Sequence, residues 1–336
     1  MPESMLKGTD GPLQEAFDAA LVDLDGVAYR GPQAIPSAPP ALQAARDAGM
    51  SIVFVTNNAS REPHEVADHL SSLGIPTDPD EVLTAAQALA RLMAGDLEPA
   101  ATVLAVGGKG LRTALTELGF TLVASAQDNP DAVAQGFVPE ISWRDLAEAA
   151  YAVQGGARFF ATNLDLTLPN ERGIAPGNGS LVGAVVHATG VNPTAAGKPE
   201  PTMFQHAAAS VAAEKPLAIG DRLDTDLKGA RAAGMPGLLV FTGVSSAADA
   251  VLAPRDQRPS YVGENLECLA ESHPAPRLEG ATWIVRAASA FVDGRRLNVT
   301  GSGIDAVRAA CAAAWASADG GVQVDGGTIP DFRVGS

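Results

Sequence analysis

Polar residues follow several apolar runs of this sequence, and their types could do chemistry. The first group is Asp23-Leu24-Asp25-Gly26, in which two carboxylates lie two residues apart. One carboxylate could attack an electrophile while the other transfers a proton, and the glycine would let the chain turn after the first acid. Taken alone, an acidic pair in such a loop is more often a solvated turn. The pair therefore needs support from other parts of the chain.

Two further groups could bind an anion. Thr56-Asn57-Asn58 offers a hydroxyl, two amides and backbone N–H groups to phosphate oxygens, although a turn with a helix cap would explain it too. Gly197-Lys198-Pro199 contains one of only five lysines in the chain. Lysine acts as a point charge toward anions, but most lysines are simply exposed at the surface.

A fourth group, Gly220-Asp221-Arg222-Leu223-Asp224-Thr225-Asp226, is rich in carboxylates. Such oxygens suit a hard cation such as Mg²⁺, which keeps several waters and takes one or two carboxylates. The alternative is an acidic helix start that the helix dipole favours.

The elements that must position these groups alternate between short apolar runs and amphipathic helical stretches. This alternation predicts βαβ units and a largely parallel sheet. Open α/β sheets bind ligands beyond the carboxyl ends of their strands, so the polar groups are expected along one edge. The predicted strands are 19–23, 51–55, 217–219 and 237–241, and the predicted helices are 39–48, 63–73, 202–213 and 224–233.

Charge and cysteine content exclude several classes of function. The formal net charge of −16 argues against a nucleic-acid binder and against docking on an anionic membrane. The two cysteines form no Cys-x-x-Cys pair, so neither a zinc site nor a disulfide framework is expected. No apolar run approaches the length of about 20 residues that spans a bilayer, and no leader is evident. We expect a cytoplasmic protein without nucleic-acid or membrane partners.

The four groups, in this order, resemble the motifs of the haloacid dehalogenase superfamily over about residues 17–267. The long insertion between the second and third groups resembles the class IIA cap of NagD-like, phosphoglycolate and glycerol-3-phosphate phosphatases. The expected fold is α/β, with a Rossmann-like parallel-sheet core, an inserted α/β cap domain and a small C-terminal α+β module. Its expected parts are the core at 14–83 and 186–268, the cap at 84–185, and the module at 275–336.

The resemblance implies a role for each polar group. Asp23 would be the nucleophile that becomes an aspartyl phosphate, and Asp25 the acid and base. Mg²⁺ would be held by Asp23, the main-chain carbonyl of Asp25 and Asp221, with Asp226 close behind these ligands. The residues expected to bind phosphoryl oxygens are Thr56, Asn57, Asn58 and Lys198.

Substrate choice is expected to lie in the cap, where residues 161–169 resemble the family's specificity loop with Asn163, Asp165 and Leu168. Pyridoxal-phosphate enzymes place a histidine where this chain has Leu168, so pyridoxal phosphate is disfavoured. The whole pattern, including the C-terminal appendage, resembles glycerol-3-phosphate phosphatases, so glycerol 3-phosphate is the favoured substrate. The alternatives are phosphoglycolate or a broad range of esters such as 4-nitrophenyl phosphate. The sequence leaves the oligomeric state open, and a homodimer is one alternative because capped relatives often dimerise.

A rival hypothesis of another class is a non-catalytic binding or regulatory module. In that case Gly301-Ser302-Gly303, which resembles the pyrophosphate loop of acetyltransferases, would make the tail a coenzyme A site; the alternative, which the short length of the tail favours, is a structural appendage. Asn298 stands where that family expects Arg or Gln.

Overall fold

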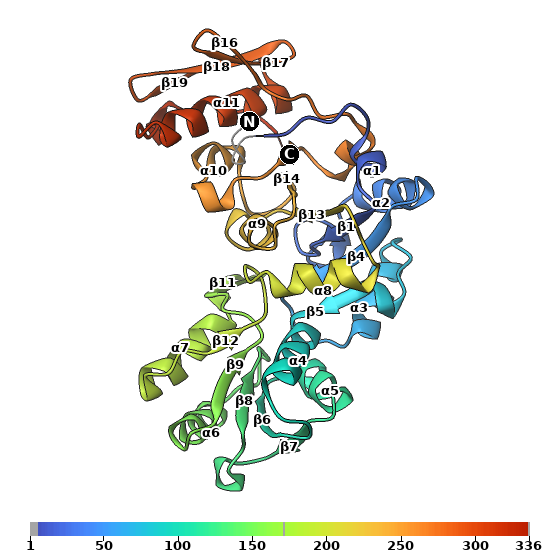
Figure 1. Ribbon diagram of the computed structural model, residues 1–336, viewed down its shortest axis with the longest axis vertical. Helices are drawn as coiled ribbons and strands as arrows, with labels where there is room; N and C mark the ends of the chain where they lie inside the picture. The colour runs from blue at the N-terminus through green and yellow to red at the C-terminus, as the bar shows by residue number, and fades with distance from the viewer. Residues whose placement is uncertain (1–5, 171, 335–336) are drawn as a thin grey trace. The chain divides into compact units, whose positions relative to one another are not determined.

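The computed structural model describes residues 6–170 and 172–334 of the 336-residue chain. Its contacts divide the described residues into two units, whose elements Figure 1 labels. The first unit contains residues 6–53, 73–75 and 208–334, and the second contains 54–72 and 76–207 with the same gap at 171.

A parallel sheet lies at the centre of the first unit. Strands β15 (Tyr261–Gly263), β14 (Gly237–Val240), β13 (Pro216–Gly220) and β1 (Ala19–Val22) pair side by side in that order. Next to β1 comes β4 (Ser51–Thr56), whose last residues belong to the second unit and pair with β5 (Val82–Thr84). Nearly every strand residue is buried, as expected for parallel strands that are covered on both faces.

Successive strands of this sheet are added first on one side of β1 and then on its other side. From β1 it continues to β4 on one side, and it later returns to β13 on the other side. Ligand sites of open α/β sheets form at such a switch point. Because Val22 pairs with Ile219, the residues that follow β1 and β13 emerge at the same edge.

Helix α2 shows how the sequence forms the surrounding helices. It spans Ala38–Asp47, and its buried residues Ala38, Ala41, Leu42 and Ala45 recur at the spacing of one helix face. The other helices and short strands of the first unit, and those at its margins, are α1 (Leu13–Ala16), β2 (Tyr29–Arg30), β3 (Gln33–Ala34), α8 (Thr202–Ser210), α9 (Lys228–Ala232) and α10 (Ala247–Leu252).

The C-terminal tail forms an antiparallel sheet with one long helix, as Figure 1 shows in orange and red. Helix α11 (Gly303–Asp319) packs on this sheet, and its alanines 309, 310, 312, 313 and 314 are all buried. The same hydrophobic cluster includes Leu239 and Val262 of the parallel sheet and Trp315 of α11. The tail and the parallel sheet thus share one apolar core. The tail strands are β16 (Arg277–Glu279), β17 (Thr282–Val285), β18 (Ala288–Asp293) and β19 (Arg296–Thr300).

A second parallel sheet organises the second unit. Its strand order is β12-β9-β8-β6-β7, and a separate apolar cluster fills the space between this sheet and helices α6 and α7. The strands are β6 (Thr102–Val106), β7 (Thr121–Val123), β8 (Ala132–Gln135), β9 (Arg158–Ala161) and β12 (Thr194–Ala195), with a hairpin of β10 (Thr167–Asn170) and β11 (Gly173–Pro176). The helices are α3 (Pro63–Ser72), α4 (Ala85–Asp96), α5 (Lys109–Glu117), α6 (Trp143–Gln154) and α7 (Asn178–Thr189).

These elements confirm the predicted α/β fold class with its parallel-sheet core. The exact division into core, cap and tail module stays a prediction. Across residues 6–170 and 172–334, no helix combines the length and the apolar character that crossing a bilayer requires.

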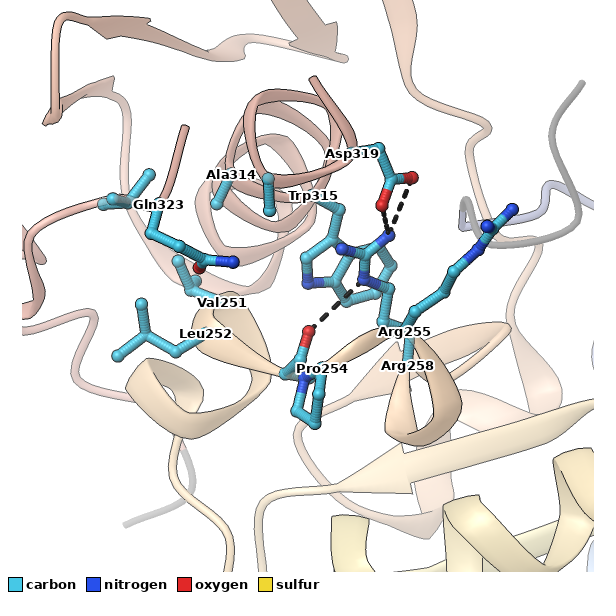
Figure 2. A pocket seen from close by; sticks show the side chains of 12 residues that line it. Val251, Leu252, Pro254, Arg255, Arg258, Ala314, Trp315, Asp319 and Gln323 are labelled. Atoms are coloured by element: carbon cyan, nitrogen blue, oxygen red, sulfur yellow. Dashed lines mark hydrogen bonds and ion pairs between the residues drawn. The ribbon is translucent and has the colours of Figure 1, made fainter. Parts of the chain in front are cut away.

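A cavity of about 350 Å³ lies between α10 and α11 (Figure 2). On its wall the buried guanidinium of Arg258 donates to both carboxylate oxygens of Asp319 at 2.9 Å and lies 5.4 Å from the Trp315 ring centroid. The indole N–H of Trp315 in turn donates to the Ala250 carbonyl at 3.0 Å. The indole therefore ties the tail helix to the parallel-sheet side of the unit.

Trp315→Ala should strongly lower the free energy of unfolding, because Trp315 is 1% exposed and its removal leaves a large void. Loss of a buried tryptophan costs about 3–5 kcal/mol. Urea denaturation measures the change. Trp143→Ala is the matched control, since Trp143 is 78% exposed and its loss should cost less than about 0.5 kcal/mol. Equal losses in the two variants would contradict the shared core.

His273 should make stability depend on pH. Burial, and then the nearby Arg308 guanidinium, lower the pKa of His273 to about 4. An unfolded histidine has a pKa of about 6.5, so between these values the unfolded chain binds more protons and stability falls as the pH falls. The slope contribution is at most about 1.4 kcal/mol per pH unit. Denaturation of wild type and His273→Gln from pH 7 to 4 should show a shallower decline in the variant; parallel curves would be evidence against this role.

Candidate active site

Three carboxylates of the first unit gather where β1 and β13 end. Asp23, Asp221 and Asp226 each offer an oxygen, and these oxygens all lie within 4.8 Å of one another. The neighbouring strands bring the first two together, since Asp23 N–H donates to the Ile219 carbonyl at 2.9 Å and Asp221 comes two residues later. The sequence prediction that these strand ends meet is confirmed.

Asp221 is held in a confined place. It is fully buried, and its Oδ2 accepts a hydrogen bond from Val244 N–H at 2.6 Å. Gly26 has a φ of +87°, which favours glycine, and a Cβ on it would lie 2.5 Å from Asp221 Oδ2. A Cβ on Gly243 would overlap the same oxygen. The two glycines leave space for this carboxylate and little else.

Asp226 reaches the cluster through a π-helical turn over Leu223–Leu227. Leu227 N–H donates to the Arg222 carbonyl at 3.2 Å, five residues back, and Asp226 Oδ2 accepts from Arg222 N–H at 3.1 Å. The prediction of an ordinary helix from residue 224 is therefore wrong at its start. The wider turn occurs because the Asp226 side chain, 1% exposed, folds back beneath the end of β13. Such turns are frequent at functional sites.

The chemistry of this cluster fits a hard divalent cation. Carboxylates so close together repel one another when all are charged, and oxygen-only ligands are what Mg²⁺ and Ca²⁺ prefer. Asp23, Asp221 and Asp226 are the side chains that would hold the cation. Asp25 is not part of this group: it is exposed and its backbone forms a bridge to Tyr29. The assignment of its carbonyl as a ligand stays a prediction.

In the second unit, two hydrogen bonds join the backbone of Lys198 to the side chain of Asn57. Lys198 N–H donates to Asn57 Oδ1 at 2.9 Å, and Asn57 Nδ2 donates to the Lys198 carbonyl at 3.0 Å. The Lys198 side chain is 2% exposed, and its Nζ donates to the Val55 carbonyl at 3.1 Å. A lysine so buried is not an ordinary surface lysine. The alternative that Lys198 is an exposed surface lysine is therefore excluded.

The rest of the Thr-Asn-Asn group forms a tight turn after β4. Thr56 is 3% exposed, and its Oγ1 accepts from Asn58 N–H at 3.1 Å. Asn58 Oδ1 accepts from the backbone N–H and the hydroxyl of Ser60 at 2.9 and 2.7 Å. The Asn58 side chain thus stabilises the turn, while the Thr56 hydroxyl keeps its own proton available to an acceptor.

The predicted specificity loop lies in the same unit and contacts Asn57. Asn163 Nδ2 donates to the Asn57 carbonyl at 2.8 Å, and Asp165 Oδ2 accepts from Asn57 Nδ2 at 3.0 Å. Leu168 lies in β10 and is 39% exposed. The structure therefore joins the loop to the Asn57 turn through polar residues, and Leu168 takes no part in that network.

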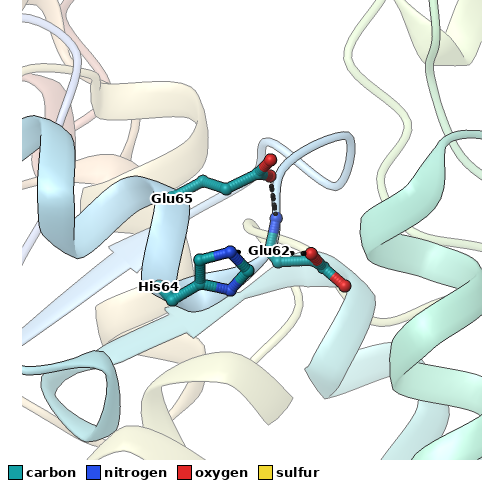
Figure 3. Close-up of side chains that lie close together, drawn as sticks. All are labelled: Glu62, His64 and Glu65. Carbon is teal, nitrogen blue, oxygen red and sulfur yellow. Dashed lines mark hydrogen bonds and ion pairs between the residues drawn. The ribbon is translucent and has the colours of Figure 1, made fainter.

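Glu62, His64 and Glu65 form a second group of potential metal ligands, which Figure 3 shows. Glu62 already pairs with the Lys109 ammonium and accepts from the Thr113 hydroxyl at 2.6 Å. The hydrogen bond from Lys109 is the main cause that lowers the pKa of Glu62, and the same bond raises the pKa of Lys109. Through these interactions Glu62 joins the turn after β4 to helix α5, and Lys109 supplies the positive charge that the group needs.

Comparison with known proteins decides the family. A haloacid dehalogenase-like hydrolase model matches residues 20–121, and a HAD-hydrolase-like model matches residues 195–269. The chain is 42% identical to the D-glycerol 3-phosphate phosphatase of Mycobacterium tuberculosis, over 90% of this chain and 87% of that protein. This chain belongs to the haloacid dehalogenase-like hydrolase family.

Two further matches cover different lengths of the chain. A glycerol phosphate phosphatase from M. tuberculosis, solved in complex with magnesium, is 42% identical with a TM-score of 0.85 and covers 91% of this chain and 92% of its own. A 5'-nucleotidase of Bacillus subtilis is 37% identical over 69% of this chain and 90% of its own.

Sequence reasoning missed the loop after β14. Thr242 Oγ1 donates to the Gly26 carbonyl at 2.6 Å, and the next two residues, Gly243 and Val244, enclose Asp221. A signal was available, because Thr242-Gly243 directly follows a predicted strand of the same sheet, and such positions are where α/β sites form. The loop therefore completes the acidic cluster of this family member.

Gly243→Ala should weaken divalent cation binding, because the added methyl group displaces the Asp221 carboxylate. Calorimetric titration with Mg²⁺ should show a loss of about tenfold or more, the equivalent of about 1.4 kcal/mol. Gly183→Ala is a matched control: Gly183 lies within α7 and a Cβ there meets nothing within 4 Å. An unchanged affinity in Gly243→Ala would mean that Asp221 is not a ligand.

Proposed function

We propose that this protein is a Mg²⁺-dependent phosphatase that hydrolyses glycerol 3-phosphate to glycerol and phosphate. The observation that carries the proposal is the 42% identity to a D-glycerol 3-phosphate phosphatase over 90% of the chain, a share that must include part of the tail. The acidic cluster and the buried Lys198 supply the chemistry that such an enzyme needs.

In the proposed reaction, a carboxylate oxygen of Asp23 attacks phosphorus as the bond from phosphorus to the glycerol oxygen breaks. Asp25 gives its proton to the departing oxygen, so that glycerol leaves neutral. Asp25 then takes a proton from water, the resulting oxygen attacks phosphorus, and the bond to Asp23 breaks. The exposed position of Asp25 suits a group that must exchange protons with water.

The roles proposed for the cation and for the phosphate-binding residues follow from the negative charges that meet at the site. A phosphate dianion beside several carboxylates is repelled, and bound Mg²⁺ would screen that repulsion and withdraw charge from the phosphoryl oxygens. Asp23, Asp221 and Asp226 would hold this cation. We assign Lys198, Thr56 and the backbone around Asn57 and Asn58 to the phosphoryl oxygens, since phosphate binding requires cationic and N–H or O–H donors.

The loop containing Asn163 and Asp165 is proposed to face the leaving group. Asp165 offers a carboxylate that could accept hydrogen bonds from the hydroxyls of glycerol, and Leu168 would limit the site on its apolar side. A second candidate is broad activity on phosphate monoesters, which the 37% identity to a 5'-nucleotidase favours. The substrate profile distinguishes the two.

The proposal includes a cytoplasmic location and a small phosphate ester as the partner, without nucleic acid or membrane. Cys268 and Cys311 are free and buried, which fits a reducing compartment. The homodimer stays a prediction.

The test is phosphate release from glycerol 3-phosphate, phosphoglycolate, a nucleoside monophosphate and 4-nitrophenyl phosphate, each with Mg²⁺ and with EDTA. We expect the highest kcat/KM for glycerol 3-phosphate and loss of turnover in EDTA that added Mg²⁺ restores. Similar kcat/KM values for all esters would favour the broad phosphatase. If the protein hydrolyses none of these esters, the phosphatase hypothesis is refuted and the non-catalytic binding module is the remaining hypothesis.

Asp23→Asn is the control variant within this test. It keeps the shape of the side chain but lacks the nucleophilic oxygen, so turnover should fall by at least about 10³-fold while the thermal midpoint stays close to that of wild type. Asp80→Asn removes the same charge from an exposed position and should leave turnover unchanged.

A further inference from the structure

Asn178 is a buried amide outside all the sequence motifs. It is the first residue of α7 and is 2% exposed. Its Nδ2 donates to the Asn163 carbonyl at 2.8 Å and lies 3.5 Å from Thr162 Oγ1. The next residue, Gly179, packs so closely that a Cβ on it would overlap the Leu164 carbonyl. The start of α7 therefore lies directly against the backbone of the loop at 163–165.

From Asn163, hydrogen bonds continue to the anion-binding residues. Asn163 Nδ2 donates to the Asn57 carbonyl at 2.8 Å, and its Oδ1 accepts from Asp165 N–H at 3.2 Å. Asn57 in turn bonds both the N–H and the carbonyl of Lys198. One relay thus joins Asn178 to Lys198 through two amide side chains, all within the second unit.

The Asn178 side chain contributes its Nδ2 donor to this relay. Among the described residues, Asn178 Oδ1 is buried and accepts no hydrogen bond from the protein. An apolar side chain of the same size could not donate to the Asn163 carbonyl.

We propose that Asn178 is a positioning residue for the phosphatase reaction. It fixes the Asn163 carbonyl, so that the Asn163 amide holds the Asn57 turn and, through it, the backbone of Lys198. This inference rests on the proposed function. Because Asn57 and Lys198 are assigned to the phosphoryl group, which all substrates share, loss of Asn178 is expected to weaken phosphate binding for every substrate.

The experiment compares wild type with Asn178→Ala and Asn178→Leu, the second of which keeps the volume of the side chain. We expect both variants to raise the Kd of inorganic phosphate, measured by calorimetry with Mg²⁺, by about five- to tenfold. The kcat/KM for glycerol 3-phosphate and 4-nitrophenyl phosphate should fall by one common factor. A purely structural role would lower the folded fraction without changing the Kd of the folded molecules.

Ser180→Ala is the matched control. Ser180 lies in the same helix start and donates to the Leu166 carbonyl at 2.7 Å, away from Asn163, so its loss should leave the Kd of phosphate within about twofold of wild type. An equal effect of Ser180→Ala, an unchanged Kd in the Asn178 variants, or failure of both variants to fold would overturn the proposal. If wild type binds phosphate but turns over no ester, the proposed function fails while the binding comparison still tests Asn178.

Discussion

Mutual repulsion among buried carboxylates is the constraint on which the site in the first unit depends. Asp221 and Asp226 are both almost fully buried, and Asp23 joins them at the ends of two adjacent parallel strands. Such an arrangement is costly unless a cation enters it. The switch point of the sheet, the glycines beside Asp221 and the π-turn at Asp226 all serve to hold these oxygens together despite that cost.

The fold class and several of the main site residues were predictable because they depend on local patterns. Asp23, Thr56 and Asp221 each lie at the end of a short apolar strand, and strand ends of a parallel sheet meet at one edge. The helix over 39–48 was predictable from the spacing of its apolar residues Ala41, Leu42 and Ala45, which the structure buries. The apolar face of an amphipathic helix is visible in its sequence as such a periodic pattern.

What escaped prediction depends on contacts between distant segments. The π-turn forms because Asp226 bonds Arg222 N–H and fits beneath β13, which no helix propensity encodes. Helix α7 was not predicted. Its first residue, Asn178, donates to the carbonyl of Asn163, 15 residues away in the sequence, and the Asn163 side chain donates to the carbonyl of Asn57, which lies a further 106 residues away. Hydrogen bonds of this kind leave no periodic signal along a chain.

The shared apolar core of the tail has a consequence for the acidic cluster. The cluster that buries α11 also contains Leu223 and Leu227 of the π-turn and Phe241, the residue before Thr242. The alanines of α11 and the residues that flank the acidic cluster therefore belong to one continuous apolar cluster. A substitution in the tail that disturbs this cluster is therefore expected to affect the packing beneath the acidic cluster as well.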